Sequence, residues 1–326
     1  MARSAFVTGS TGFVGLNLVQ RLVTEGWDVT ALHRASSDLT YLRRFKPRLV
    51  VGEITDASSL DVALPKECDT VFHVAGNTNL WRKKNAEQTR DNVDGTRNVV
   101  EACIAKGVRR LVVTSSISAY GPVSGAVTEE TGSLAATSWI NYQKTKWEAQ
   151  EIARAATTRG LEVVILQPGA IVGPYDLGSW SRLFYLVRDG KLRGVPPGRR
   201  TFSHVREVVS AHIAAADAGE NGGQYILGGE NARMLDLVQE IARLLGKPIP
   251  TRETPLFLVK AVAAVSDFLG AMTGREPSVT SEMVDAFAKE ITVTAAKAQR
   301  DLGFQVVPLK TMVKDCHDWM VAERRI

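Results

Sequence analysis

Short apolar runs alternate with longer amphipathic stretches through the first half of the chain. The apolar runs are Ala5–Thr8, Asp28–His33, Arg48–Ile54, Thr70–Ala75, Arg110–Ser115 and Leu161–Leu166. They are rich in Val, Leu and Ile, which is typical of strands that are buried on both faces. Between them, the stretches Phe13–Glu25, Ala86–Lys106 and Tyr142–Thr158 predict helices, and Ser58–Leu64 predicts a short turn. This alternation predicts an α/β fold with a doubly wound parallel sheet.

The pattern changes after Pro168, where the alternation stops and residues 169–198 are dense in Gly, Pro and aromatic residues. We expect strands at Thr201–Val205 and Gln224–Leu227 to return to the sheet. From Met234 onward the pattern predicts mostly helix. The chain is therefore divided into a sheet domain over residues 1–172, to which those strands return, and a smaller, mostly helical C-terminal region over residues 173–326.

Leu256–Thr273 is the longest apolar stretch of the C-terminal region. It is shorter than the roughly 20 residues that a membrane-spanning helix needs, and it contains Lys260 and Asp267. These features favour a buried helix or a lid over a membrane span. The N-terminal residues lead directly into a predicted strand, so we expect neither a signal peptide nor a membrane partner.

A glycine-rich loop, Gly9-Ser10-Thr11-Gly12-Phe13-Val14-Gly15, joins the first predicted strand to the first predicted helix. In such a loop the first glycine allows a tight turn, the second lets the backbone approach a pyrophosphate, and the third lets the helix pack close to the sheet. The helix N-terminus then faces the anion. A glycine-rich turn without a ligand is the alternative, which the strand and helix on either side disfavour. The loop predicts a dinucleotide cofactor and makes residues 1–172 a Rossmann domain.

The end of the second predicted strand indicates which cofactor binds. NAD-binding proteins tend to have an acid there for the ribose hydroxyls, whereas an Arg accommodates the 2′-phosphate of NADP. Here no acid occurs before Asp38, and Arg34 is well placed; a guanidinium group suits a phosphate. A surface Arg at a strand end is the alternative. We expect NADP(H), with NAD(H) as the alternative.

Tyr142 and Lys146 lie four residues apart on a predicted helix and therefore share a face. An ammonium group near a phenol favours the phenolate and lowers its pKa, which suits acid-base chemistry. The pair alone is a common coincidence, but it follows Thr114-Ser115-Ser116 at the end of a strand, where parallel sheets bind ligands. The pattern predicts a catalytic site at this end of the sheet.

Charge and cysteine content restrict the expected partners, metal sites and cellular compartment. The net charge is +5, but no nucleic-acid-binding motif accompanies it, so we expect a solvated surface and no nucleic-acid partner. Three distant cysteines form neither a disulfide framework nor a zinc spacing, and the five histidines are scattered. We expect a cytoplasmic protein without a metal site.

Together these motifs resemble the extended short-chain dehydrogenase/reductase family. The matching segments are Thr8 to Gly15, His73-Val74-Ala75-Gly76, Asn92 to Thr96, Thr114-Ser115-Ser116, Tyr142 with Lys146, Gln167-Pro168-Gly169, Phe202 to Val205 and Leu302-Gly303-Phe304. The resemblance runs nearly from end to end. Its dihydroflavonol reductase-like branch is similar in the segment around Arg34, whereas Ile117-Ser118 replace the acidic pair of the family's dehydratases.

The resemblance implies roles for individual residues. Ser116 would hydrogen-bond the substrate oxygen, Tyr142 would transfer the proton, and Lys146 would bind the nicotinamide ribose. Ser115 and Ser118 are alternatives to Ser116, which is preferred because it stands four residues before Tyr120-Gly121. The cofactor would contact Gly9, Thr11, Gly12, Phe13, Val14, Arg34, Glu53, Ile54, Ala75, Gly76, Asn92, Thr114, Tyr142, Lys146, Pro168, Gly169 and Ile171.

The resemblance leaves several functions open. The first is an NADPH-dependent reductase of a ketone or aldehyde, whose small-molecule substrate, a carbonyl compound or alcohol, binds the region 173–326. A nucleotide-sugar epimerase with bound NAD and a 3β-hydroxysteroid dehydrogenase would use the same residues. A non-catalytic cofactor-sensing protein is disfavoured by the intact Ser116, Tyr142 and Lys146. We also expect a homodimer through the helices Ala86–Lys106 and Tyr142–Thr158, because Ala149, Ala153, Ala155 and Ala156 permit close helix approach.

Overall fold

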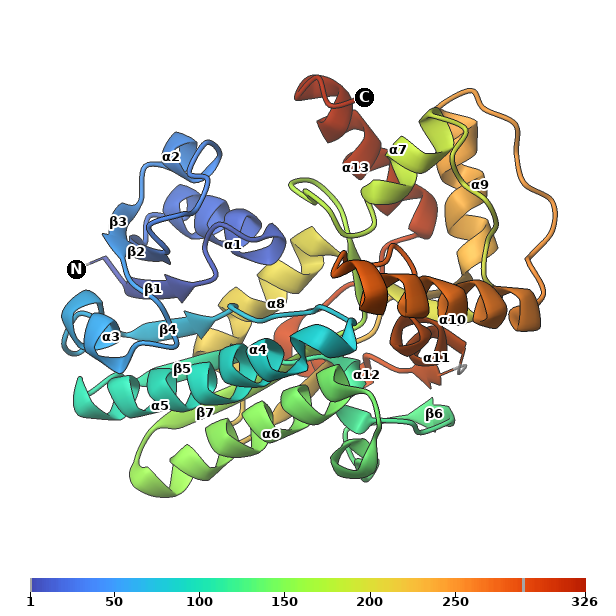
Figure 1. Ribbon diagram of the computed structural model, residues 1–326. Helices are drawn as coiled ribbons and strands as arrows, with labels where there is room; N and C mark the ends of the chain where they lie inside the picture. The colour runs from blue at the N-terminus through green and yellow to red at the C-terminus, as the bar shows by residue number, and fades with distance from the viewer. Residues whose placement is uncertain (1, 289–290) are drawn as a thin grey trace.

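The computed structural model describes residues 2–288 and 291–326, and a seven-stranded parallel sheet forms its centre (Figure 1). The strands in spatial order are β10 (Gln224–Leu227), β7 (Glu162–Pro168), β5 (Arg110–Thr114), β4 (Thr70–His73), β1 (Ser4–Thr8), β2 (Asp28–His33) and β3 (Arg48–Val51). Their burial explains the apolar runs, since β5 is buried along its whole length and β7 nearly so. The predicted doubly wound α/β fold is confirmed.

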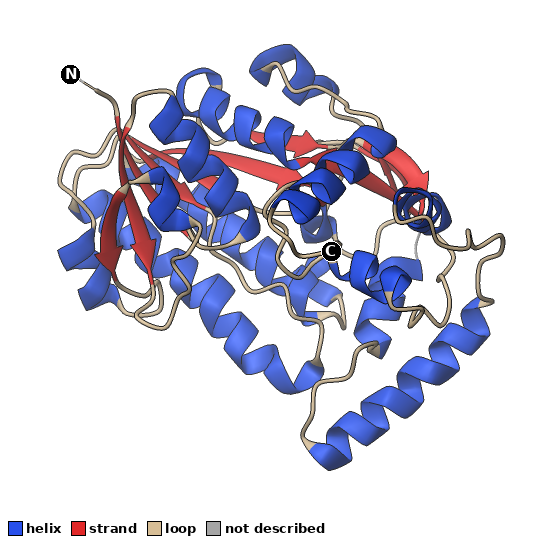
Figure 2. Cartoon of the chain, turned by 90° about the horizontal axis from the view of Figure 1, so that it is seen from above, coloured by secondary structure: helices blue, strands red, loops and turns tan. Residues whose placement is uncertain are grey.

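Helices cover both faces of this sheet (Figure 2). One face is packed by α1 (Phe13–Thr24), α8 (Val205–Ala218) and α12 (Ala296–Leu302). The other is packed by α3 (Ala57–Ala63), α5 (Gly95–Ala105) and α6 (Asn141–Ala155). Helix α1 is amphipathic and buries Leu18, Val19 and Leu22 against the sheet. Asp56 caps α3 by accepting hydrogen bonds from the backbone N–H groups of its first turn.

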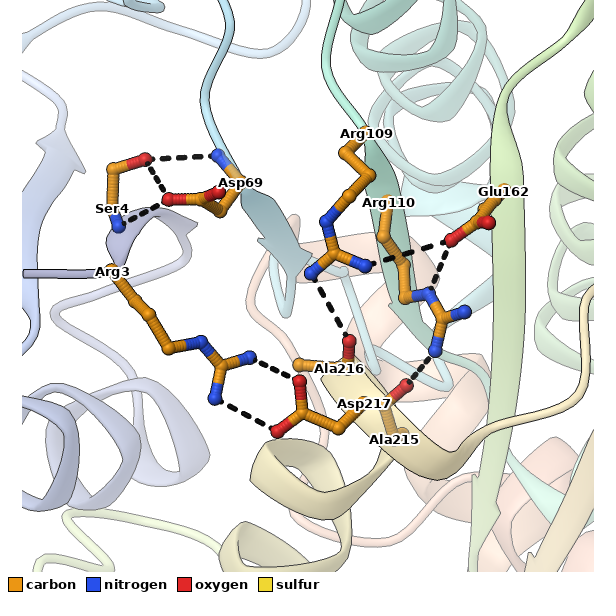
Figure 3. Close-up of polar contacts among 9 residues, drawn as sticks. All are labelled: Arg3, Ser4, Asp69, Arg109, Arg110, Glu162, Ala215, Ala216 and Asp217. Atoms are coloured by element: carbon orange, nitrogen blue, oxygen red, sulfur yellow. Dashed lines mark hydrogen bonds and ion pairs between the residues drawn. The ribbon is translucent and has the colours of Figure 1, made fainter. Parts of the chain in front are cut away.

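Polar contacts fix the amino ends of the strands to the C-terminal end of α8 (Figure 3). Both terminal nitrogens of Arg3, beside β1, donate to Asp217 at 2.8 and 2.6 Å. Arg110, at the start of β5, donates to Glu162 at 2.8 Å and to the Ala215 carbonyl oxygen at 2.9 Å. Arg110 thus satisfies a carbonyl of the last turn of α8, and Arg3 pairs with a carboxylate of the same turn. This end of the sheet is closed by structural contacts, and the opposite end remains for ligands.

Two smaller sheets join short strands of residues 1–172 to strands of the C-terminal region, which also contains most of the remaining helices. One sheet contains β8 (Ala170–Val172), β9 (Arg199–His204) and β11 (Glu230–Arg233), and another contains β6 (Gly125–Val127) and β12 (Ile291–Val293). Helices α7 (Arg182–Arg188), α9 (Met234–Leu244) and α13 (Leu309–Ala322) share a separate apolar core. The remaining helices are α2 (Leu42–Phe45), α4 (Asn85–Thr89), α10 (Leu256–Thr273) and α11 (Ser281–Ala288).

Three expectations about this region need correction. β10 joins the main sheet beside β7, but β9 does not, because it pairs with β8 and β11 instead. Of the two alternatives for Leu256–Thr273, the buried helix is wrong and the lid stays a prediction: only 11% of α10 lies inside the protein, although its length and composition would allow it to cross a membrane. Of the four alanines on and after α6, Ala149, Ala153 and Ala156 are buried within the chain, so they do not offer an outer surface to a partner helix.

Candidate active site

The glycine-rich loop folds as a tight turn between β1 and α1. Gly9 has a φ of +67°, and its carbonyl oxygen accepts a hydrogen bond from the Gly12 N–H at 3.0 Å. A Cβ on Gly15 would lie 2.0 Å from that oxygen, so the position requires glycine. Helix α1 begins at Phe13 and Val14, and the N–H groups of its first turn have no partners within the helix. These groups form a cradle for an anion.

The loop lies where the strand order of the sheet reverses. β1 pairs with β2 on one side and with β4 on the other, and ligands of such sheets bind in the crevice at this point. A Cβ on Gly9 would lie 2.6 Å from the Ala75 nitrogen, so the loops after β1 and β4 are in direct contact. Thr11 and Ala75 are half-buried here, and Gly76 is exposed.

The carboxyl ends of β2 and β3 lie beside this crevice. They are joined by a hydrogen bond from the Gly52 N–H to the His33 carbonyl oxygen at 3.0 Å. Arg34 and Glu53 follow the two strands with exposed side chains, and Ile54 is half-buried next to them. Within the part of the chain that the structure describes, the Arg34 guanidinium has no hydrogen-bond or ion-pair partner. It is therefore available to an anionic ligand.

A directed chain of hydrogen bonds connects the first strand to Asn92. Thr96 Oγ1 donates to the Asn92 carbonyl oxygen at 2.6 Å, so it accepts from His73 Nε2–H at 3.0 Å. His73 Nδ1 is then the acceptor for Thr8 Oγ1–H at 2.8 Å. Thr8 Oγ1 in turn accepts from the Ala75 N–H at 3.3 Å. The chain fixes the loop after β4 relative to the helix that contains Asn92.

The direction of this chain depends on a neutral imidazole. Only 2% of the His73 surface is exposed. Burial, together with the nearby Lys146 ammonium group, lowers the pKa of His73 to about 3. The imidazole therefore stays neutral at physiological pH, with its proton on Nε2. No sequence pattern indicates a role for His73 or Thr96 beyond the family motifs that contain them.

Asn92 lies in a π-helical turn, Arg90–Asp94, between α4 and α5. Its Nδ2 donates to the Asn77 carbonyl oxygen at 2.9 Å and to Thr145 Oγ1 at 3.0 Å, and its Oδ1 accepts from the Asn77 N–H at 2.7 Å. Asn92 thus joins the loop after β4 to the segment of α6 between Tyr142 and Lys146. The π-helical turn, a feature frequent at functional sites, was not predicted from the sequence.

Ser116 is the serine that faces Tyr142. Its Oγ accepts from the Ser118 N–H at 3.1 Å, and a hydrogen bond joins its hydroxyl to the Tyr142 phenol. Ser115 is buried and donates to Gln150 Oε1 at 3.0 Å, so its hydroxyl points into the protein. The geometry distinguishes Ser116 from Ser115, and Ser118 contacts Ser116 through its backbone N–H.

Tyr142 and Lys146 lie on the same helix without a direct bond. Lys146 Nζ donates to the Thr114 carbonyl oxygen at 3.0 Å. Burial raises the pKa of the Tyr142 phenol, and the hydrogen bond from Ser116 opposes this change. The ammonium group is directed to the strand end, and an effect of Lys146 on the pKa of Tyr142 stays a prediction. Burial also lowers the pKa of Lys146, to about 8.

The Thr114 side chain belongs to the protein interior. His212 Nδ1–H donates to the Val208 carbonyl oxygen at 2.7 Å, so His212 Nε2 accepts from Thr114 Oγ1–H, also at 2.7 Å. Burial lowers the pKa of His212 to about 4, although its bond to Val208 opposes the shift. The Thr114 carbonyl oxygen contacts the site by accepting a hydrogen bond from Lys146. A contact between the Thr114 hydroxyl and the cofactor stays a prediction.

The end of β7 completes the crevice. β7 ends at Pro168, and a Cβ on Gly169 would lie 2.5 Å from Thr201 Cγ2 and 2.6 Å from the Thr201 oxygen. Ile171 follows in β8, where it pairs with Ser203 of β9. The small sheet is therefore packed directly against the end of the main sheet, and glycine is needed at this junction.

Several of the predicted residues meet at one point. Ala75, Asn92, Thr114 and Lys146 line a cavity of ≈ 10 Å³. A Cβ on Gly76 would lie 3.1 Å from Lys146 Nζ and 3.5 Å from Asn92 Oδ1. The absence of a side chain at Gly76 leaves the ammonium group open toward the crevice.

These residues fit a nicotinamide dinucleotide. In the spatial order of the strands, Arg34 follows β2, the glycine cradle follows β1, Gly76 follows β4, Ser116 follows β5 and Gly169 follows β7. An extended ligand along this edge would meet a cation at one end, N–H donors at its centre and the Ser-Tyr-Lys group at the other end. The glycine positions, which a Cβ would fill, leave room for close approach of its phosphates.

Comparison with known proteins agrees with this geometry. Residues 5–228 match the model of the NAD dependent epimerase/dehydratase family. A Synechocystis sp. protein named "Putative dihydroflavonol 4-reductase" is 33% identical over 98% of this chain and 95% of its own length. "Sterol demethylase protein B" of Methylococcus capsulatus is 28% identical over 97% of this chain and 98% of its own.

Solved structures resemble the fold over nearly the whole chain. The crystal structure of gox2253 has a TM-score of 0.84 at 29% identity and covers 99% of both chains. MoeE5 in complex with UDP-glucose and NAD has a TM-score of 0.74 at 25% identity and covers 98% of this chain and 99% of its own. The protein thus belongs to the NAD-dependent epimerase/dehydratase family of extended short-chain dehydrogenases/reductases, enzymes that bind a nicotinamide cofactor and act on CH–OH or C=O groups.

Proposed function

We propose that the protein is an NADPH-dependent reductase of a ketone or aldehyde. The observation that carries this proposal is the meeting of Ser116, Tyr142 and Lys146 at the end of β5, beside the glycine cradle. When bound, the nicotinamide supplies a hydride to the carbonyl carbon. The protein supplies the proton and the orientation of the substrate.

Tyr142 is the general acid of the reduction. Its raised pKa keeps the phenol protonated at neutral pH, which is the state that a proton donor needs. Ser116 directs its hydroxyl to the same point and polarises the substrate oxygen, while the Ser118 N–H holds its Oγ in place. The proton passes from the Tyr142 oxygen to the alkoxide oxygen as the C–H bond forms, and the product is an alcohol.

Lys146 and Arg34 bind the cofactor at its two ends. The Lys146 ammonium group, anchored on the Thr114 carbonyl oxygen and open toward Gly76, would hold the nicotinamide ribose. Arg34 would bind the 2′-phosphate of NADP through charge-assisted hydrogen bonds. Such a contact contributes roughly 1.5–3 kcal/mol, or about one to two decades of affinity. Reversal of the charge in Arg34→Asp removes the preference for NADPH, measured as kcat/KM with each cofactor. A wild type that favours NADH would overturn this role.

We propose an apolar substrate. One relative is named for a sterol and another for a dihydroflavonol, both small molecules with fused or linked rings. The proposal includes a cytoplasmic location, in line with three free buried cysteines, and a homodimer through α5 and α6. Light scattering at about micromolar concentration tests the dimer, and a monomer contradicts it.

The test of the reaction is Tyr142→Phe, assayed against a panel of ketones and aldehydes. The variant should keep cofactor binding and lose about 10²–10⁴-fold in turnover. Tyr225→Phe is the matched control, because the Tyr225 hydroxyl accepts a hydrogen bond from the Glu220 N–H at the far edge of the sheet, away from Tyr142. Near-normal turnover of Tyr142→Phe would sink the assignment of the acid.

A nucleotide-sugar epimerase is the second candidate, favoured by the likeness to MoeE5 with UDP-glucose and NAD. In that reaction Arg200 would bind the sugar diphosphate. In this chain Arg200 Nη2 donates to the Ala286 carbonyl oxygen at 3.2 Å, which is a contact within the protein. Purified protein that retains NAD and interconverts sugar nucleotides without net cofactor consumption would establish the epimerase instead.

A further inference from the structure

Helix α10 presents an apolar face to solvent. Phe257, Val262, Phe268 and Met272 are 70%, 57%, 64% and 71% exposed. Leu258, Val265 and Leu269 add to this face, which we call the α10 face. The helix extends along the outside of the molecule (Figures 1 and 2). At about 100° per residue, these seven positions span about 140° of the helix circumference, so they form one continuous stripe.

The opposite side of α10 is fixed to the protein. Lys260 pairs with Asp285 of α11 at 3.2 Å, and Asp267 accepts from the Ser281 N–H at 2.9 Å. Ala263 is buried on the same side, as is Gly270, where a Cβ would lie 2.6 Å from Pro277. The helix is thus held in one rotation about its axis, and the α10 face stays on the outside. A soluble core helix directs such a stripe inward.

Exposed cations lie at both ends of the α10 face. Arg252 precedes the helix and Arg275 follows it, both with exposed side chains. Lys83, on the neighbouring turn, donates to the Ala271 carbonyl oxygen at 2.8 Å. The exposed acid Glu276 is paired with a lysine. Two copies of the chain joined through this face would bring these cations together, which opposes self-association, whereas an anionic surface complements them.

We propose that α10 docks the protein on the surface of an anionic lipid bilayer. The helix would lie in the plane of the interface, with the α10 face in the headgroup and acyl boundary and the flanking cations on lipid phosphates. It would not cross the bilayer, because Lys260, Asp267 and the folded residues that they bind keep one side of the helix on the protein. This partner differs from our expectation of no membrane partner.

The docked helix would bring the active site near the lipid. Thr280, between α10 and α11, donates to the Leu80 carbonyl oxygen at 2.6 Å, and Asn79 donates to Glu276 at 2.7 Å. Both contacts hold the loop that leads from Gly76 to α4. An apolar substrate could then enter from the bilayer without passing through water. This consequence rests on the proposed function, but the docking does not.

Co-sedimentation with vesicles tests the docking without any substrate. The full chain should sediment with vesicles of equal parts phosphatidylcholine and phosphatidylglycerol, and far less with phosphatidylcholine alone. Phe257→Gln with Phe268→Gln should weaken binding at least about tenfold. Val62→Gln with Val321→Gln is the matched control, since these exposed residues lie on α3 and α13 and should leave binding unchanged.

Two further measurements separate the possible outcomes. Arg252→Gln with Arg275→Gln should weaken binding to anionic vesicles about tenfold or more, since each cation near the surface contributes about 1 kcal/mol, while any binding to neutral vesicles stays the same. Turnover of a water-soluble carbonyl compound should be unchanged in all these variants. The proposal is overturned if the wild type stays in the supernatant or if the phenylalanine variant sediments equally. A dimer that those two substitutions dissolve would instead assign the α10 face to a second copy.

Discussion

Acid should destabilise this protein through two buried histidines, and His212→Gln isolates one of them. The pKa of His212 is about 4 in the folded protein, against an ordinary value of 6.5. Below pH 6.5 the unfolded chain binds a proton that the folded chain does not. The stability that His212 contributes is therefore fully present above pH 6.5 and is lost as the pH falls toward 4. The complete loss corresponds to about 3 kcal/mol, and about 2 kcal/mol is lost by pH 5.

His73 should act in the same direction, because burial lowers its pKa to about 3. Together the two histidines should lower the free energy of unfolding by about 4 kcal/mol between about pH 7.5 and about pH 5. Glutamine at position 212 can donate to the Val208 carbonyl oxygen and accept from Thr114, as His212 does, but it does not titrate. The variant should therefore lose only about half as much stability as the wild type.

The assay is urea unfolding at both pH values, followed by tryptophan fluorescence and circular dichroism. His33→Gln is the control, since His33 is partly exposed and lies at the end of β2. It should retain the full decrease. An equal decrease in the His212→Gln variant and the wild type would refute the reasoning, because the buried imidazole would then bind its proton without unfolding. Activity at neutral pH should survive in the variant, since the Thr114 carbonyl oxygen still holds Lys146.

The remaining predictions concern the cradle, the hydrogen-bond chain and the closed end of the sheet. Gly15→Ala should abolish cofactor binding, measured by fluorescence of bound NADPH, because its Cβ would lie 2.0 Å from a backbone oxygen. Gly12→Ala, at 3.3 Å from the same oxygen, should weaken binding only partly, and equal effects would contradict the geometry. Thr96→Val leaves the His73 Nε2–H without an acceptor and should cost about 1–3 kcal/mol in urea unfolding; an unchanged stability would disprove that bond. Arg110→Met removes the cation of β5 that binds Glu162 and the end of α8, and it should lower the free energy of unfolding by about 1.5–3 kcal/mol without changing kcat. A loss of kcat at full stability would contradict a purely structural role.

Local pattern was sufficient for most of the central sheet. The predicted strand Asp28–His33 has the bounds of β2, because the polar Asp28 and the turn at Gly26 mark its beginning. The predicted strands at Arg48–Ile54 and Thr70–Ala75 were each too long. Their last residues are already loop, because ligand-binding loops of parallel sheets continue the apolar run beyond the last ladder bond.

The sequence did not predict the strand pairing of β9 or the exposure of α10. Arg199–His204 has the pattern of a strand, but nothing in it specifies β8 and β11 as its neighbours rather than the main sheet. The apolar composition of Leu256–Thr273 is compatible with a buried helix and with an exposed one. The contacts of α10 with α11 determine which side of the helix faces the protein. His73 and His212 have hydrogen-bond partners 65 and 98 residues away in the sequence, a separation that no local pattern encodes.

The arginine contacts at the amino ends of the strands also constrain when the protein can finish folding during synthesis. Arg3 leaves the ribosome before its partner Asp217, which follows 214 residues later. At about 5–20 residues per second, β1 waits roughly 10–40 s for that contact. β10, the edge strand, is made later still. Throughout this interval the apolar face that α8 later covers is open to solvent. The nascent chain therefore exposes an apolar surface to which chaperones can bind. A chain truncated before residue 217 should lack both the Arg3–Asp217 contact and the edge strand β10.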